Sequence, residues 1–293
     1  MAEKSRFTKD HFIEVNQCPW CGAVARGLLY EAPYHAGIQE CKECGLVYSD
    51  RILNKCGLEL YWGSYLTEVH TKDAVLVEKR NKMYAIEYQQ ICRFMNVAGG
   101  NVLDVGCGSG GFLEHFQNAG ACCYGVEYGR EAADEAARKF QVWRGEFPKM
   151  EINENFDLII FRGSLQYCIN PKSYLEKAMC LLNPGGLLFI TSTPNARSLC
   201  FRLFKEHFTL PVCMTDYYGF HESLITGFLQ ERNGRLLCSQ QLYLETPYAD
   251  PYNDILKVAK AIEYTRRGEK IDFLSPPFFD NMLSLIYQKG ENK

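Results

Sequence analysis

The chain has 293 residues, 47% of them hydrophobic, so it can bury a full core and form about two domains. Its formal net charge of -3 argues against extended nucleic-acid binding, which requires a basic surface. The N-terminal residues lack the apolar core of a signal peptide, and no segment approaches the roughly 18 consecutive apolar residues of a membrane span. We therefore expect a cytoplasmic protein without a membrane span, whose 14 cysteines are mostly reduced.

Two C-x-x-C pairs lie near the N-terminus, Cys18 with Cys21 and Cys41 with Cys44. A glycine follows the second cysteine of each pair and permits the tight turn of a metal knuckle. A redox pair is the alternative, but such a site uses one C-x-x-C within a βαβ unit, and no such unit surrounds these. The spacing predicts a four-cysteine zinc ribbon over residues 1–50, and the zinc is structural because four protein ligands leave no position for water.

Residues 51–98 form a connector with aromatic and helical character. Apolar residues at near-helical spacing predict a helix over residues 73–95. Tyr61 and Tyr65 precede this helix, and an aromatic face attracts a cation, so either ring could cover a positively charged ligand. Ordinary packing between domains is the alternative role for both.

The segment VLDVGCGSGG, residues 102–111, reads as a strand, a glycine turn and the start of a helix. Gly106, Gly108 and Gly111 fit the dinucleotide-binding pattern G-x-G-x-x-G. Asp104 argues against that ligand, because a carboxylate at the end of the strand opposes a pyrophosphate and suits a cation. A dehydrogenase is therefore disfavoured.

The run D-x-G-x-G-x-G that starts at Asp104 resembles motif I of class I S-adenosylmethionine-dependent methyltransferases. The order of the segments downstream agrees with that family. The resemblance implies an α/β fold over residues 99–293, with a Rossmann-like sheet of seven strands and S-adenosylmethionine as cofactor. It implies that Glu127 accepts hydrogen bonds from the ribose and that Glu146 contacts adenine. The remaining cofactor contacts implied by it are Asp104, Gly106, Cys107, Gly108 and Gly110.

The region after the fourth strand departs from the family. Where the family commonly has Leu-Glu-His, this chain has Leu165, Gln166 and Tyr167, so the usual proton acceptor is replaced. We expect catalysis mainly by positioning, with Tyr167 lining the site and His221 as a second candidate for proton transfer. A capping role at a helix start is the alternative for His221. Arg162 is the charged residue at this strand end and could bind the cofactor carboxylate or an anionic substrate.

The C-terminal part predicts a helix over 221–231, a sixth strand near 236–244 and a last strand over 282–288. Between these strands lies an insert, residues 245–279. Ligands of doubly wound sheets bind beside the strand carboxyl ends, so we assign the insert to the substrate pocket or to a homodimer contact.

Over nearly its whole length the chain is similar to bacterial methyltransferases of sugar, polysaccharide and secondary-metabolite pathways that carry a zinc ribbon. That resemblance implies a small, sugar-like methyl acceptor. One alternative is an RNA methyltransferase that reads RNA through the ribbon, but the ribbon carries few basic residues. A non-catalytic module that binds S-adenosylmethionine is the other alternative, and the intact Asp104, glycines and Glu127 argue against it.

Overall fold

A twisted sheet of seven strands forms the centre of the molecule in the computed structural model, which describes residues 7–63, 65–66 and 73–291. Six strands run parallel, and β13 is antiparallel to both of its neighbours. The predicted α/β sheet is confirmed, and its sixth and last strands begin within two residues of the expected positions. The strand order is β12 (Gly234–Ser239), β13 (Met282–Lys289), β10 (Leu182–Pro194), β9 (Phe156–Arg162), β6 (Asn101–Val105), β7 (Cys122–Glu127) and β8 (Gln141–Arg144).

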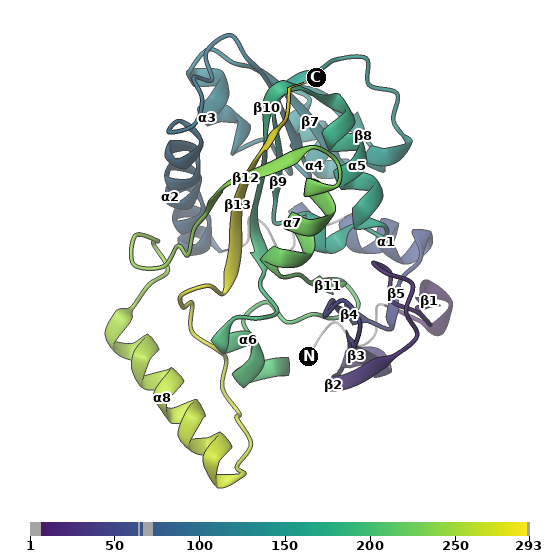
Figure 1. Ribbon diagram of the computed structural model, residues 1–293, viewed down its shortest axis with the longest axis vertical. Coiled ribbons are helices and arrows are strands. Elements are labelled where there is room, and N and C mark those ends of the chain that lie inside the picture. Colours follow the sequence, from purple (N-terminus) through teal and green to yellow (C-terminus); the bar gives the residue numbers. More distant parts are fainter. Residues whose placement is uncertain (1–6, 64, 67–72, 292–293) are drawn as a thin grey trace.

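Helices cover both faces of this sheet because successive strand residues alternate between two apolar cores. Val102 belongs to the core that holds residues of α2 (Ala74–Ile91), α3 (Leu113–Asn118) and α4 (Arg130–Ala136). Its neighbour Leu103 belongs to the core that contains residues of α5 (Pro171–Leu181) and α7 (Glu222–Gln230). In Figure 1, α2 and α3 lie on one side of the sheet, with α5 and α7 on the other.

The N-terminal part contributes two small sheets and one helix. β1 (Phe12–Glu14) pairs with β5 (Arg51–Leu53), and α1 (Lys55–Trp62) follows directly. The second small sheet has the order β11, β4, β3, β2, formed by Tyr218–Gly219, Val47–Ser49, Ala36–Cys41 and Arg26–Ala32 respectively. Short 3-10 helices occupy Lys9–His11, Pro33–His35, Phe147–Lys149, Leu165–Tyr167 and Lys205–His207.

The N-terminal ribbon is joined to the part of the chain that forms the large sheet by β11, which comes from far downstream in the sequence. Tyr218 pairs with Tyr48, and Gly219 pairs with Val47. The Trp20 ring of the ribbon packs 5.9 Å from the Phe220 ring and 5.1 Å from the Phe228 ring. The expected boundary at residue 50 therefore divides the sequence but not the hydrophobic core, which is continuous from Cys18 to the large sheet.

The insert forms α8 (Pro251–Arg267), which lies beyond the lower end of the large sheet (Figure 1). Val258 and Ala261 on its inner face pack into the core that holds α6 (Leu199–Phe204). Its outer face exposes Tyr252 and Ile255. None of the helices in the described ranges is long and apolar enough to cross a membrane.

Candidate active site

The glycine turn between β6 and α3 takes left-handed backbone angles at three positions, with φ of +88° at Gly106, +55° at Gly108 and +87° at Gly110. A Cβ at Gly106 would lie 2.5 Å from the Ser164 Cβ, and one at Gly110 would lie 2.6 Å from the Phe140 ring, so both glycines are needed for close packing. A Cβ at Gly108 would meet nothing within 4 Å. Gly108 therefore leaves room for a ligand to approach the bare backbone.

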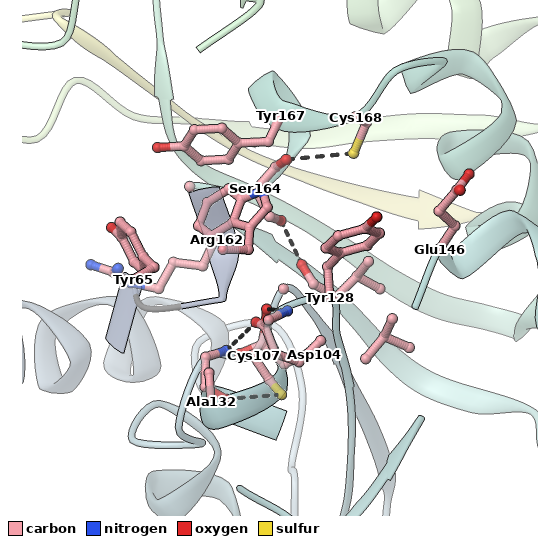
Figure 2. A pocket seen from close by; sticks show the side chains of 18 of the residues that line it. Tyr65, Asp104, Cys107, Tyr128, Ala132, Glu146, Arg162, Ser164, Tyr167 and Cys168 are labelled. Atoms are coloured by element: carbon pink, nitrogen blue, oxygen red, sulfur yellow. Dashed lines mark hydrogen bonds between the residues drawn. The ribbon is translucent and has the colours of Figure 1, made fainter. Parts of the chain in front are cut away.

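A cavity of about 260 Å³ opens above this turn, at the carboxyl ends of β6, β7 and β9. It lies where ligands bind in doubly wound sheets. In Figure 2, Tyr65, Arg162 and Tyr167 gather on one side of it, and Glu146 lies on the opposite side. All eight predicted cofactor residues except Gly110 line the cavity, and so does Tyr167.

Asp104 is a buried carboxyl at the floor of the cavity. Its Oδ1 atom has no hydrogen-bond partner among the residues described. Burial raises the pKa of Asp104 to about 7, although the nearby Arg162 lowers it. An orphaned carboxylate oxygen in a buried site fits a cationic ligand such as a sulfonium, which would restore the charged form.

Glu127 ends β7 beside the glycine turn, as predicted. One of its carboxylate oxygens accepts the N–H of Gly108 at 2.9 Å, and the other accepts the N–H of Gly129 at 2.7 Å. These bonds fix the carboxylate at the cavity wall, and each oxygen keeps a second lone pair for a ribose hydroxyl. Cys107 lines the cavity as well, but its Sγ is directed at β7, where a Cβ at Gly125 would lie 2.5 Å away.

Glu146 and Arg162 differ in how strongly the protein already neutralises them. Glu146 lies at the far end of the cavity, and its carboxylate is 2.8 Å from the Lys149 ammonium. The Arg162 Nε donates to the fully buried Glu87 at 2.6 Å, and the guanidinium lies 4.5 Å from the centre of the Tyr84 ring. Because Glu87 neutralises Arg162, the guanidinium forms part of the wall rather than a free anion site.

The side of the cavity beyond Arg162 is lined by aromatic rings. The Trp62 ring lies 5.1 Å from the Tyr167 ring and 4.8 Å from the Tyr65 ring. Tyr167 also lies close to the Asp216 carboxyl, and burial raises the pKa of the Tyr167 phenol well above its usual range. Sequence reasoning named Tyr65 and Tyr167 but missed Trp62. In the sequence, Trp62 lies between Tyr61 and Tyr65, which were both considered.

His221 does not line the cavity. It is the N-cap of α7, where its Nδ1 accepts the N–H of Leu224 at 3.2 Å. Its Nε2 lies 3.0 Å from the carbonyl oxygen of Cys44, to which it donates. The structure therefore places Tyr167 in the same cavity as the predicted cofactor residues but leaves His221 at the ribbon, in the capping role that was its alternative.

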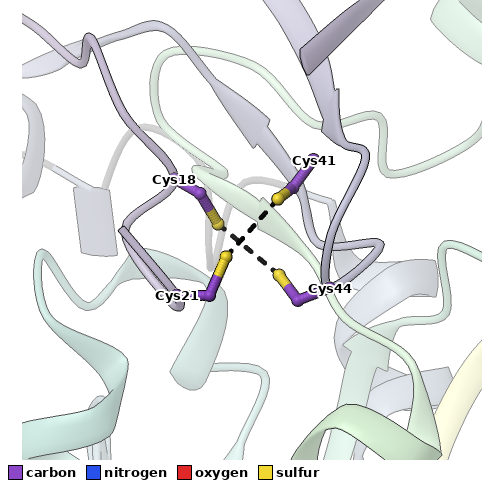
Figure 3. Close-up of side chains that lie close together, drawn as sticks. All are labelled: Cys18, Cys21, Cys41 and Cys44. Carbon is purple, nitrogen blue, oxygen red and sulfur yellow. Dashed lines mark hydrogen bonds between the residues drawn. The ribbon is translucent and has the colours of Figure 1, made fainter. Parts of the chain in front are cut away.

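The four N-terminal cysteines converge on one point (Figure 3). All four Sγ atoms lie within 4.8 Å of one another. The Sγ atoms of Cys18 and Cys44 are 3.6 Å apart, and those of Cys21 and Cys41 are 3.5 Å apart. Four thiolates around one point are the ligand set of a structural metal ion.

A family model described as a methyltransferase domain matches residues 79–283. The chain belongs to this methyltransferase-domain family. Its domain is a class I S-adenosylmethionine-dependent methyltransferase domain, as the glycine turn and Asp104 led us to expect. The match begins within α2 and so leaves the ribbon outside it.

Curated relatives include ubiquinone biosynthesis O-methyltransferases of two bacteria. The protein of Acinetobacter baylyi is 26% identical over 137 residues, which are 43% of this chain and 58% of that protein. The protein of Shewanella sp. strain ANA-3 is 28% identical over 192 residues, which are 60% of this chain and 79% of that protein. The chain thus spans less than two thirds of the Acinetobacter relative.

Solved structures share the fold at low sequence identity. One is a chain from the complex between the Haloferax volcanii Trm112 methyltransferase activator and a methyltransferase, with a TM-score of 0.58, 14% identity, and coverage of 78% of this chain and 98% of that one. Another is magnesium protoporphyrin IX methyltransferase from Synechocystis PCC 6803 with bound S-adenosylhomocysteine. Its TM-score is 0.57 at 13% identity, and the match covers 81% of this chain and 100% of that one.

Proposed function

We propose that this protein transfers a methyl group from S-adenosylmethionine to a hydroxyl of a small, planar acceptor. The observation that carries the proposal is that one cavity joins the Asp104 and Glu127 carboxyls to the aromatic rings of Trp62, Tyr65 and Tyr167. One end of this cavity suits a cationic nucleoside, and the other suits a flat molecule.

The cofactor supplies an electrophilic methyl carbon on a sulfonium when it is bound. The backbone at Gly108 lets it approach closely, Glu127 holds the ribose, and Asp104 balances the positive charge. Glu146 lies at the end of the cavity that we assign to adenine. The protein then acts mainly by holding the acceptor oxygen in line with the methyl carbon, which lowers the barrier without covalent participation of a side chain.

The lining of the acceptor end favours a planar acceptor over a sugar. A sugar exposes hydroxyls all around its ring, and each one that is buried without a partner costs about 1–3 kcal/mol. The side chains of Trp62, Tyr65, Tyr84 and Tyr167 line the cavity. Aromatic rings of this kind pack against the flat face of a planar molecule, and the tyrosine hydroxyls can supply polar contacts. A phenol or catechol therefore fits better than the sugar-like acceptor that the sequence resemblance implied. The names of the ubiquinone biosynthesis O-methyltransferases agree with oxygen as the methylated atom.

The experiment compares acceptors under one assay. We expect release of S-adenosylhomocysteine, and a product heavier by one methyl group, with simple phenols or catechols and not with sugar nucleotides or RNA. Calorimetry with S-adenosylhomocysteine checks that the cofactor site is intact. A protein that binds the cofactor but methylates only sugar nucleotides or RNA would refute the planar acceptor.

We also propose that Cys18, Cys21, Cys41 and Cys44 hold one structural zinc ion. A tetrahedral zinc with sulfur ligands at about 2.3 Å requires sulfur–sulfur separations of about 3.8 Å, close to the 3.6 Å between Cys18 and Cys44 and the 3.5 Å between Cys21 and Cys41. Metal analysis of the purified protein should find one zinc per chain, and Cys21→Ser should lower that ratio.

A further inference from the structure

Asp216 is a carboxyl group beside the acceptor end of the cavity that the function proposed above does not use. The residue is partly buried, and its Oδ1 atom has neither solvent access nor a hydrogen-bond partner in the described part of the chain. Its Oδ2 accepts from the Thr215 hydroxyl at 3.4 Å. A half-satisfied carboxyl at the edge of a reaction cavity calls for a role, because leaving such a group unpaired costs free energy.

The backbone holds Asp216 against Tyr167. The N–H of Cys213 donates to the Asp216 carbonyl at 2.8 Å and closes a tight turn. The N–H of Tyr217 donates to the Gln166 carbonyl at 2.9 Å, so the residue after Asp216 is bonded to the residue before Tyr167. The Tyr167 hydroxyl lies close to the Asp216 carboxyl, and this interaction lowers the pKa of the carboxyl and raises the pKa of the phenol.

The groups that face Asp216 are phenols and a thiol. Tyr61, at the end of α1, and Tyr65, just after it, approach from one side. Tyr30 on β2, Tyr217 and Cys213 complete the surroundings. No lysine, arginine or histidine in the described ranges contributes to the pKa of Asp216, which burial raises to about 6. Since burial also raises the pKa values of the surrounding phenols, Asp216 is the group of this set that is ionised at neutral pH.

We infer that Asp216 accepts, through the Tyr167 hydroxyl, the proton that the acceptor hydroxyl loses during methyl transfer. This inference rests on the proposed O-methylation. A lone pair of the acceptor oxygen forms the new bond to the methyl carbon. The carbon–sulfur bond breaks at the same time, and the electron pair of that broken bond stays on sulfur. The acceptor proton moves to the Tyr167 oxygen while the Tyr167 proton moves to Asp216. Tyr167 touches the acceptor, and Asp216 is a positioning residue that acts through it. Asp216 returns its proton to solvent when the product leaves.

The test is a pH profile of kcat at saturating cofactor. For the wild-type protein, we expect kcat to fall with unit slope below about pH 6, because protonation removes the accepting carboxylate. Asp216→Asn should lower kcat about 100-fold and abolish this acid limb, because general-base removal typically costs 10²–10⁴-fold. The Kd for S-adenosylhomocysteine should stay within twofold. Tyr167→Phe should do the same, and the double variant should be no slower than either single one, because the two residues work as one unit.

Tyr217→Phe is the matched control. It removes a buried phenol hydroxyl from the residue next to Asp216, and that hydroxyl has no hydrogen-bond partner among the described residues. Its kcat should equal that of the wild type. Should Asp216→Asn fail to fold, Tyr167→Phe and Asp216→Glu decide: the first must lose the acid limb, and the second must keep it.

The possible failures are separable. An Asp216→Asn protein that keeps a kcat within threefold of the wild type, or keeps the acid limb, overturns the inference and leaves O-methylation standing. A wild-type protein that binds cofactor but methylates no hydroxyl overturns the proposed function and this inference with it.

Discussion

Removing one partner of the buried ion pair between Glu87 and Arg162 should destabilise the protein strongly. Glu87 is fully buried on α2 and accepts three hydrogen bonds: from Arg162 at 2.6 Å, from Thr191 at 2.9 Å and from Ser192 at 3.1 Å. It thereby ties the helix to the carboxyl ends of β9 and β10. Glu87→Gln keeps the shape and can keep the two hydroxyl bonds, but it leaves the Arg162 side chain, only 15% exposed, without the carboxylate that is hydrogen-bonded to it.

Breaking a buried pair from one side costs about 3–5 kcal/mol, and the two bonds that the amide can keep favour the lower value. At about 2–4 °C per kcal/mol, a loss of about 3 kcal/mol lowers the unfolding temperature by about 6–12 °C. Differential scanning calorimetry of the two proteins measures this shift.

Glu78→Gln is the control on the same helix. The Glu78 carboxylate is 2.7 Å from the Lys82 ammonium, but both side chains are more than half exposed, so this change should leave the unfolding temperature unchanged. The reasoning fails if Glu87→Gln is no less stable than Glu78→Gln. A second readout is charge-specific: the uncompensated Arg162 should weaken binding of cationic S-adenosylmethionine more than binding of neutral S-adenosylhomocysteine.

Three further predictions follow from the cavity and the cysteine cluster. Glu127→Ala should weaken S-adenosylhomocysteine binding at least tenfold by calorimetry, whereas Glu135→Ala on the exposed face of α4 should not; equal affinities would remove Glu127 from the ribose site. Because the folded-state pKa of Asp104 is raised to about 7, its contribution to stability is present at low pH and is lost as the pH rises through 7. Asp104→Asn should therefore raise the unfolding temperature at pH 8 but not at pH 3, while weakening S-adenosylmethionine binding; a protein that is destabilised at pH 8 would contradict this. Removing zinc with a chelator should loosen the ribbon and also lower kcat, with zinc content and kcat measured on the same sample. Full activity of the metal-free protein would show that the ribbon does not support the active site.

The sequence was sufficient for the large sheet and for most of the residues that line the cavity beside the glycine turn. Apolar runs, the glycine turn and the spacing from Asp104 to Glu127 are local signals, because each element carries its own periodicity and its own turn residues. The four cysteines are equally explicit, since ligand type and spacing are read directly from the chain.

Contacts between distant segments were not predictable in this way. Glu87 sits in a helix rich in charged residues and gives no sign that it alone is buried against Arg162, 75 positions later. β11 has only two residues, too few to show an alternating pattern, and its partner β4 lies about 170 positions earlier. Asp216 lies in a turn without a motif. The capping role of His221 was foreseen as its alternative, but its contact with Cys44, 177 positions away, was not predictable.

The pairing of β11 with β4 bears on where this protein can be cut. A shortened chain that starts at residue 79, where the family match begins, would leave β11 with a row of unpaired N–H and C=O groups and would uncover the rings of Phe220 and Phe228 that Trp20 shields. Open strand edges beside bare aromatic surface promote aggregation. For expression and crystallisation, the domain limits drawn by sequence similarity are therefore the wrong ones. The N-terminal fifty residues should be kept, because they cover β11 and the Phe220 and Phe228 rings.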